Sequence, residues 1–203
     1  MGEGRTIALW CAVGVLCGAL AVWLAPAPLA GEQIEWSSRL DAPLRFELDG
    51  TRGRVDASTL RGRWTIVQIG FLHCPDACPT GLARLARLVT ALNATPAGAS
   101  VDVVFVSVDP GRDELAALAD HVAWFHPAFA AATGRTAELR RFCDALGLRF
   151  AVSADGERYE VAHSEAFTII GPDGALHGRF RPGFDVDRTA RELAARISTG
   201  NAG

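Results

Sequence analysis

The sequence contains no lysine, and all 20 of its basic residues are arginine. We attribute the absence of lysine to the codon usage of a GC-rich bacterial genome. An excess of basic charge is also missing, because the formal net charge is −3 and the sequence pI is about 5.9. Proteins that bind nucleic acid carry a basic surplus, so this composition argues against a nucleic-acid partner.

Internal repeats are absent, and the only low-complexity tract is the short Ala-Pro stretch at 25–28. The 203 residues are 49% hydrophobic and 21% charged, which is enough apolar material for one well-buried domain. The chain is too short for two large domains. We therefore expect one globular domain over residues 44–199, preceded by a tether at 31–43.

Charged residues are missing from residues 7–25, IALWCAVGVLCGALAVWLA. A helix needs about 20 apolar residues to cross a bilayer core, whereas the apolar part of a signal peptide has about 7–15. The length therefore favours a single uncleaved N-terminal transmembrane helix within residues 1–30. A cleaved signal peptide is the alternative, because small residues at 25–27 and 29–31 offer cleavage sites.

The short segment before this apolar run favours translocation of the rest of the chain. We therefore expect a single-pass protein of the bacterial inner membrane, with its soluble domain in the periplasm. Thiols outside the cytoplasm are exposed to oxidation, so cysteines that stay reduced there need a reason to do so.

Two apolar, β-branched runs at 64–70 and 101–109 are typical of strands in the middle of a parallel sheet. Residues 79–92 between them carry leucines at helical spacing, which predicts a βαβ unit. The later segments predict helices at 113–125, 136–146 and 185–197, and short strands at 158–164, 167–171 and 175–180. This order is typical of an α/β, thioredoxin-like fold, with a central mixed sheet flanked by helices. That fold keeps its chemistry in a cysteine motif just after the first core strand.

The stretch GFLHCPDACPTGLARL, residues 70–85, carries Cys74 and Cys78, each followed by a proline. Helical residues four apart have Cβ atoms about 5–6 Å apart, whereas a disulfide requires about 3.5–4.5 Å. Two thiolates on one metal lie about 4 Å apart when the metal–sulfur bonds are near 2.3 Å. The spacing thus permits a disulfide but suits a metal clamp better. A helix N-terminus also stabilises thiolates over thiols, which metal binding and nucleophilic attack both require.

A second cysteine pair is missing, which argues against a structural zinc site with four thiolates. The three cysteines outside the motif are Cys11, Cys17 and Cys143, the first two within the apolar segment. Histidines are therefore the remaining candidate ligands. His163 ends a short strand, and the expected fold returns this part of the chain toward the helix that carries the motif. Two thiolates and one imidazole form a donor set suited to copper, because Cu(I) readily accepts three ligands.

The other candidate residues have simpler interpretations. Cys143 lies on an apolar helical face and is expected to be a buried core thiol. Asp76 is expected to complement the helix N-terminus, and His73 to tune the charge of the neighbouring thiolate. Asp109 and Arg112 are expected to form a loop-shaping salt bridge or a partner contact. The histidines expected to be solvated or locally bonded are His121, His126 and His177.

The motif GFLHCPDACPTGL resembles the signature of the Sco/SenC proteins, which carry Cys-x-x-x-Cys-Pro on a thioredoxin-like fold. Matching stretches follow in order at 107–114 (SVDPGRDE), 133–147 and 159–176 (YEVAHSEAFTIIGPDGAL). The resemblance covers residues 40–199. It implies copper binding by Cys74, Cys78 and His163, and a role in the maturation of cytochrome c oxidase.

This resemblance implies a copper chaperone that delivers copper to the binuclear copper centre of cytochrome c oxidase subunit II. Another periplasmic copper carrier is a further expected partner. The alternative is a thiol–disulfide oxidoreductase that keeps the cysteines of that subunit reduced, with Cys74 and Cys78 as its catalytic residues. A peroxiredoxin-like peroxidase is a third interpretation, weakened by Phe71 and Leu72 where such enzymes typically have threonine.

Two positions depart from the family pattern. The family usually has aspartate directly before the ligand histidine, and here that position is Ala162. If that aspartate orients the histidine, its absence is expected to weaken the orientation of His163 and the affinity for metal. Leu72 stands where threonine is common, whereas both cysteines and both prolines of the motif are retained.

Overall fold

The computed structural model describes residues 33–37, 45–95, 101–155 and 158–200, and its compact globular unit begins at Gln33. Within these residues, no helix combines the length and the apolar character needed to cross a membrane. The transmembrane helix predicted within residues 1–30 lies outside the described residues.

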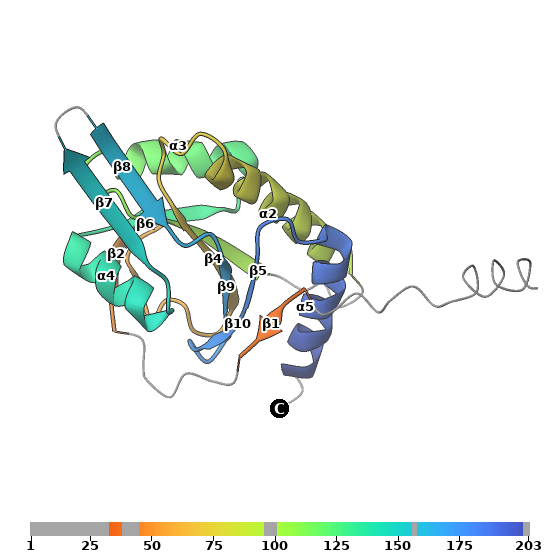
Figure 1. The fold of residues 1–203 in the computed structure, drawn as a ribbon. Coiled ribbons are helices and arrows are strands. Elements are labelled where there is room, and N and C mark those ends of the chain that lie inside the picture. Colours follow the sequence, from red (N-terminus) through yellow and green to blue (C-terminus); the bar gives the residue numbers. More distant parts are fainter. Residues whose placement is uncertain (1–32, 38–44, 96–100, 156–157, 201–203) are drawn as a thin grey trace, which may run out of the picture. The chain divides into compact units, whose positions relative to one another are not determined.

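An eight-stranded mixed sheet forms the centre of the unit, with the strand order β1-β10-β9-β4-β5-β6-β2-β3 (Figure 1). Its strands are β1 (Glu35–Trp36), β2 (Glu47–Gly50), β3 (Val55–Asp56), β4 (Trp64–Gly70), β5 (Val101–Ser107), β6 (Ala130–Thr133), β9 (Phe167–Ile170) and β10 (Leu176–Phe180). Strand β5 is parallel to both β4 and β6, and the other neighbouring strands are antiparallel. The predicted α/β class with a central mixed sheet is confirmed.

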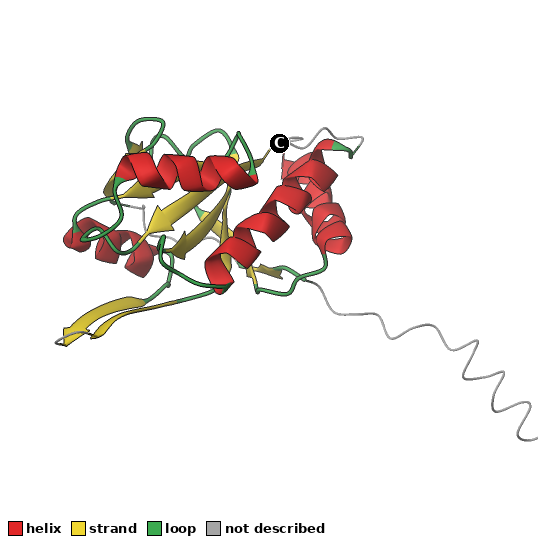
Figure 2. Cartoon of the chain, turned by 90° about the horizontal axis from the view of Figure 1, so that it is seen from above, coloured by secondary structure: helices red, strands yellow, loops and turns green. Residues whose placement is uncertain are grey.

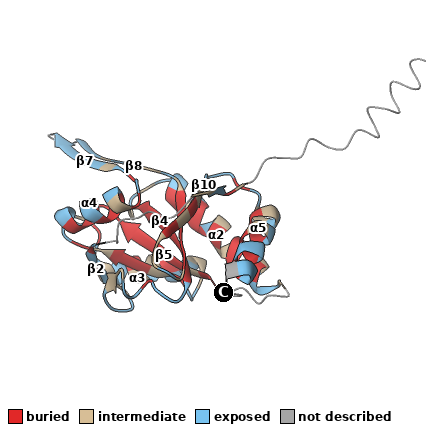
Figure 3. Cartoon of the chain, turned by 90° about the horizontal axis from the view of Figure 1, so that it is seen from below, coloured by how far each residue is buried: buried red, intermediate tan, exposed pale blue. Residues whose placement is uncertain are grey.

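Helices cover both faces of the sheet. They are α2 (Ala77–Asn93), α3 (Leu115–Phe125), α4 (Thr136–Ala145) and α5 (Val186–Gly200). Successive side chains of a strand point to opposite faces of the sheet. Ile66 therefore packs in a core cluster with residues of α2, α3 and α5. The next residue, Val67, packs in a second cluster with residues of α4 on the other face. Strand β4 is therefore buried along its whole length (Figure 3).

The globular unit extends further toward the N-terminus than the predicted domain start at residue 44. Glu35 and Trp36 form β1, which pairs with β10, and Ile34 beside them is only 1% exposed. The reason is that Ile34 joins the core cluster beneath α5 and Trp36 packs against it, so these apolar side chains draw a part of the predicted tether into the sheet.

A separate two-stranded sheet stands outside the central one. Strands β7 (Phe150–Asp155) and β8 (Arg158–His163) pair with each other and, within the described part of the chain, with no other strand. They extend from the rest of the unit (Figure 2). Most of their residues are exposed. The sequence predicted β8 as a short strand, but it gave no prediction for β7. The hairpin matters for function because its last residue is His163.

Candidate metal centre

The cysteine motif lies where the chain passes from β4 into α2. Cys74 is half-buried in the connecting loop, whereas Cys78 is buried in the first turn of the helix. The backbone N–H of Cys78 donates to Sγ of Cys74 at 3.4 Å. The helix begins at Ala77, so the assumption of regular helical spacing between the two cysteines was wrong. The loop conformation, rather than a helical turn, brings the sulfur atoms together.

His163 reaches this pair from the hairpin. Its Nε2 lies 3.6 Å from Sγ of Cys78, and its Nδ1 lies 2.9 Å from the backbone oxygen of Ser164. A carbonyl oxygen only accepts, so Nδ1 is the donor in this contact, and Nε2 is the ring nitrogen that faces the sulfur atoms. The Phe71 ring meets the imidazole edge-on, with centroids 5.9 Å apart.

The backbone oxygen of Ser164 offers the imidazole of His163 an orienting partner, which the methyl group of Ala162 cannot do. A metal-binding histidine commonly donates its other ring N–H to a carboxylate or a backbone carbonyl, which fixes the ring. The contact with Ser164 therefore gives Nδ1 of His163 a partner that does not depend on an aspartate at position 162. The expected effect of Ala162 on metal affinity stays a prediction.

The donor atoms of Cys74, Cys78 and His163 all lie within 4.8 Å of one another. Among the described residues, this is the group of three such side chains that could hold a metal ion. In a trigonal site with metal–sulfur bonds near 2.3 Å and metal–nitrogen bonds near 2.0–2.1 Å, sulfur and nitrogen lie roughly 3.8 Å apart. The measured 3.6 Å between Cys78 and His163 is close to this value. Two thiolates and one imidazole also match the ligand preference of Cu(I).

Burial controls the ionisation of the inner cysteine. Desolvation raises the pKa of Cys78, and its hydrogen bond with the Cys74 side chain raises it further. Desolvation of Cys78 thus opposes the stabilisation of a thiolate that the helix N-terminus was expected to provide. A metal must displace a proton from this thiol when it binds.

Two residues beneath Cys78 escaped the sequence analysis. Gly70 leaves room for the thiol, because a Cβ at that position would lie 2.6 Å from Sγ of Cys78 and 2.7 Å from the Phe105 ring. Gln68 is buried and donates from Nε2 to the backbone oxygen of Cys78 at 3.2 Å. The sequence offered a signal for Gln68, because it is a polar residue inside the apolar run 64–70. No local sequence feature indicated that Gly70 leaves room for the thiol.

The remaining predicted residues lie outside the group of three donors. Asp76 occupies the N-cap of α2, where it accepts from the Thr80 hydroxyl rather than from the helix backbone. The imidazole of His73 points toward Asp113, at 3.8 Å. Cys143 is buried as predicted, and burial raises its pKa to about 12. The other three histidines have local contacts: His121 with the Phe105 and Phe125 rings, His126 with the Ala128 N–H, and His177 with Asp173.

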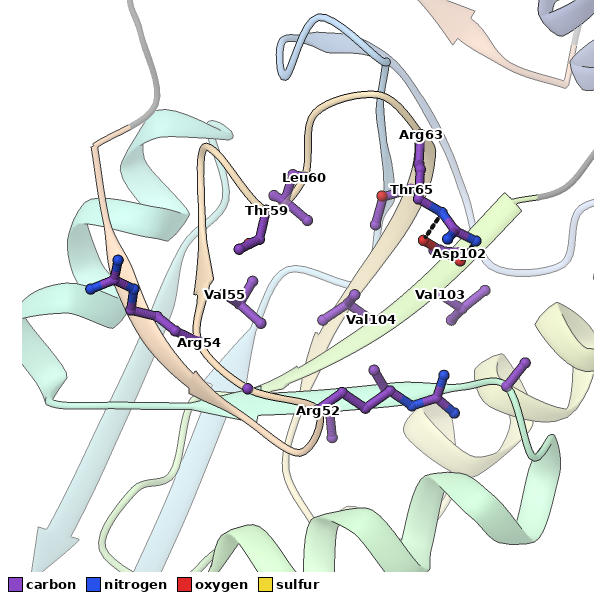
Figure 4. A pocket seen from close by; sticks show the side chains of 14 residues that line it. Arg52, Arg54, Val55, Thr59, Leu60, Arg63, Thr65, Asp102, Val103 and Val104 are labelled. Carbon is purple, nitrogen blue, oxygen red and sulfur yellow. Dashed lines mark hydrogen bonds and ion pairs between the residues drawn. The ribbon is translucent and has the colours of Figure 1, made fainter.

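A cavity of about 370 Å³ lies toward the opposite end of β4 (Figure 4). Its lining includes three arginines, each already bound to protein oxygens. Arg52 donates to the backbone oxygen of Pro127, Arg54 pairs with Glu47 and Asp56, and Arg63 pairs with Asp102. None of the residues that line this cavity belongs to the cysteine motif or to the hairpin that carries His163.

Comparison with known proteins places this arrangement in a family. A protein of Stutzerimonas stutzeri, whose name suggests copper binding, is 34% identical over 173 residues, covering 85% of this chain and 79% of its own length. The human mitochondrial protein SCO2 homolog is 35% identical over 157 residues, covering 74% of this chain. This match spans only 59% of the human protein.

Solved structures agree with these relatives. The structure of Arabidopsis thaliana ScoI with copper bound superimposes with a TM-score of 0.70 at 30% identity, covering 76% of this chain and 96% of that one. BsSco, described as a member of the Sco family of cytochrome c oxidase assembly proteins, shares the fold with a TM-score of 0.61 at 20% identity, covering 81% of this chain and 96% of its own. The sequence profile of the SCO1/SenC family matches residues 37–198. The chain belongs to the SCO1/SenC family.

Proposed function

We propose that this protein binds one copper ion through Cys74, Cys78 and His163 and passes it to a partner protein. The observation that carries the proposal is the convergence of the three donor atoms within 4.8 Å of one another. They come from two separate elements, the loop and helix after β4 and the end of β8. The copper-bound relative and the family match support the same cargo.

The site suits transfer because it is not a closed cage. Cys74 and His163 are half-buried at the surface, and only Cys78 is buried. A partner thiolate can approach from the exposed side and displace the ligands of this chain one at a time. Each metal–ligand bond that breaks is replaced by one to the partner, and the oxidation state of copper does not change.

The proposed recipient is subunit II of cytochrome c oxidase, whose binuclear copper centre would receive the ion. Membership of the SCO1/SenC family supports this recipient, as does the description of BsSco as a member of the Sco family of oxidase assembly proteins. A second periplasmic copper carrier would supply the ion. We further propose that an N-terminal helix within residues 1–30 anchors the protein in the bacterial inner membrane, with the copper site in the periplasm.

Copper binding by the reduced protein tests the proposal. Cu(I) and Cu(II) are offered separately in competition with a chelator, and the expected result is one tightly held Cu(I) per chain. Cys74→Ser and Cys78→Ser should each lose it, whereas His163→Ala should bind copper measurably more weakly, through the two remaining thiolates. Cys143→Ala is the matched control, because this thiol lies in the core cluster on the other face of the sheet. Binding of equal strength in the wild type and the three ligand variants would overturn the proposal.

A second candidate function is thiol–disulfide exchange with the cysteines of the oxidase subunit. It is favoured by the close approach of the two thiols, whose sulfur atoms lie within 4.8 Å of each other. Cys74, the more exposed of the two, would attack a disulfide of the partner and form a mixed disulfide with it. Cys78 would then resolve this mixed disulfide, which leaves the partner reduced and Cys74 and Cys78 joined. His163→Ala separates the two functions, since copper transfer should fail while exchange, which needs only the thiols, should largely persist.

A further inference from the structure

The loop between β5 and α3, residues 107–114 with the sequence SVDPGRDE, is not part of the donor set. It nevertheless contacts both of the elements that supply donors. Two of its carboxylates are almost completely buried, since Asp109 is 0% and Asp113 is 3% exposed. Burying a carboxylate is costly unless it is hydrogen-bonded, so the partners of these two residues indicate what the loop holds in place.

Asp113 holds the cysteine loop. Its Oδ2 accepts from the backbone N–H of Leu72 at 2.8 Å and from the Ser107 hydroxyl at 2.7 Å. Leu72 lies two residues before Cys74, so this contact fixes the path of the chain as it leaves β4. The exposed His73 extends the contact, with Nδ1 at 3.8 Å from Oδ1 of Asp113.

Asp109 holds the hairpin. The Tyr159 hydroxyl donates to its Oδ1 at 2.6 Å, and Nε of Arg112 donates to its Oδ2 at 2.6 Å. The guanidinium of Arg112 also lies over the Tyr159 ring, 3.7 Å from the centroid. The hydrogen bond to Asp109 raises the pKa of Tyr159. Tyr159 lies on β8, the strand that ends at His163.

The hairpin needs such a tie because little else supports its outer part. An isolated two-stranded hairpin is at best marginally stable in water, and β7 and β8 pair only with each other. At the base, Arg149 and Ser164 exchange backbone and side-chain hydrogen bonds. Among the described hairpin residues bonded to the rest of the chain, Tyr159 is the nearest to the tip.

We propose that the loop 107–114 acts as a clamp that sets the distance between the cysteine pair and His163, with Tyr159 as its positioning residue on the hairpin. The inference rests on the proposed copper function and deepens it. With the Tyr159–Asp109 bond closed, the imidazole lies against Cys78. With the bond open, the hairpin moves away and leaves copper on two thiolates, which are more readily taken by a partner.

The test is a double-mutant cycle with Tyr159→Phe, which removes one hydroxyl and keeps the ring stacked on Arg112. We expect Tyr159→Phe to weaken Cu(I) binding about tenfold, the lower end of the range for residues that orient a metal ligand. In the His163→Ala background, the same change should alter affinity less than about twofold. Ser153→Ala is the matched control, because it deletes an exposed hydroxyl from the same hairpin.

If Tyr159→Phe lowered the Cu(I) affinity equally in the wild type and in His163→Ala, Tyr159 would act on the fold or on the thiolates rather than on His163. That result would overturn the clamp. An unchanged affinity in Tyr159→Phe would overturn it as well.

Asp109→Asn tests the Tyr159–Asp109 bond from its other side. Because Tyr159 is the single tyrosine of the protein, an absorbance titration of tyrosine reports on this bond directly. The pKa of Tyr159 should fall back toward its ordinary value of 10.0 in Asp109→Asn. No change in this pKa would contradict the bond.

Hydrogen exchange in the metal-free protein separates failure of the clamp from failure of the copper function. Tyr159→Phe should speed exchange of the β7 and β8 amides about tenfold, while the amides of β4 and β5 stay unchanged. If the wild type bound no copper but this acceleration appeared, the clamp would stand and the copper function would fall. If copper bound and exchange in the hairpin were unaffected, the clamp would fall alone.

Discussion

At the scale of single residues, the candidate site is shaped by what lies behind the three proposed ligands, Cys74, Cys78 and His163. The backbone oxygen of Ser164 fixes the ring of His163, and the missing side chain of Gly70 creates the space that the Cys78 thiol fills. Neither contribution involves a side chain that could donate to a metal. The ligands alone therefore describe only a part of the site.

Gly70→Ala tests the need for this space. The added methyl group would meet both the Cys78 sulfur and the Phe105 ring, and neither can yield easily in a packed interior. We expect a loss of about 1–3 kcal/mol in the free energy of unfolding, the usual cost of overpacking, and weaker Cu(I) binding because Cys78 is displaced. Denaturant unfolding and copper competition measure the two effects.

Gly134→Ala is the control, because the three atoms nearest to a Cβ there belong to Leu48 and Glu47, which are part of neither the cysteine motif nor the clamp. If Gly70→Ala had the same copper affinity as Gly134→Ala, the packing argument for Gly70 would be refuted.

The raised pKa of Cys78 predicts how copper binding depends on pH. The thiol keeps its proton in the metal-free protein at neutral pH, and the proton must leave when the thiolate binds copper. Each released proton makes the affinity rise about tenfold per pH unit as long as the pH stays below the pKa of the thiol. Copper competition at several pH values between about pH 6 and pH 8 should therefore show affinity increasing with pH. An affinity independent of pH would show that Cys78 is already ionised.

At the scale of elements, the central sheet and the hairpin differ in how they are held. Strands β4 and β5 are buried between helices, whereas β7 and β8 are largely exposed and form a two-stranded sheet of their own. Amide exchange is fastest where few apolar contacts and many exposed hydrogen bonds are found. The metal-free protein should therefore exchange first in the hairpin and last in β4 and β5.

Mass-spectrometric hydrogen exchange of the wild type measures this order, and helix α2, which packs on the central sheet, serves as the internal reference. Copper should then slow exchange in β8, because the metal ties His163 to the cysteines. Equal exchange rates in the hairpin and in β5 would show that the hairpin is as firmly held as the core.

The sequence predicts those elements whose physical pattern is local. The long apolar runs of β4 and β5 and the leucine stripe of α2 have such patterns, and all three were predicted. Strand β6 is a run of alanines ending in Thr133, and alanine has little preference for strands. It pairs with β2 and β5 through contacts distant in the sequence. Such short strands depend on tertiary pairing and leave no local signal.

The residues of the candidate site divide in the same way, into those with a local sequence pattern and those whose position depends on the fold. Cys74 and Cys78 were singled out by their spacing, and His163 by the resemblance together with the expected return of the chain. The structure brings these three residues together, and their binding of copper stays a prediction. The clamp was missed in part, because Asp109 and Arg112 were expected to form a salt bridge but the approach of Tyr159 depends on the hairpin fold. The role of Ser164 belongs to a backbone carbonyl, which no side-chain pattern can mark.

At the scale of the whole molecule, copper binding and membrane attachment should be separable. The three donors lie between residues 74 and 163, within the described globular unit. The apolar run at 7–25 is remote from them in the sequence and makes up most of the predicted membrane helix. Removal of residues 1–30 should therefore leave the Cu(I) affinity unchanged while abolishing attachment to the membrane.

Fractionation of cells that express the full chain or the chain from Gly31 onward tests this separation. The full chain should stay with the membranes after an alkaline wash, because burying about 20 apolar residues in lipid is effectively irreversible. The shorter chain, directed to the periplasm by an unrelated cleavable signal, should be released with the periplasmic proteins. If the full chain were instead released with a new N-terminus near residues 26–31, the segment would be a cleaved signal peptide. Copper delivery would then require the protein to find its membrane partner by diffusion.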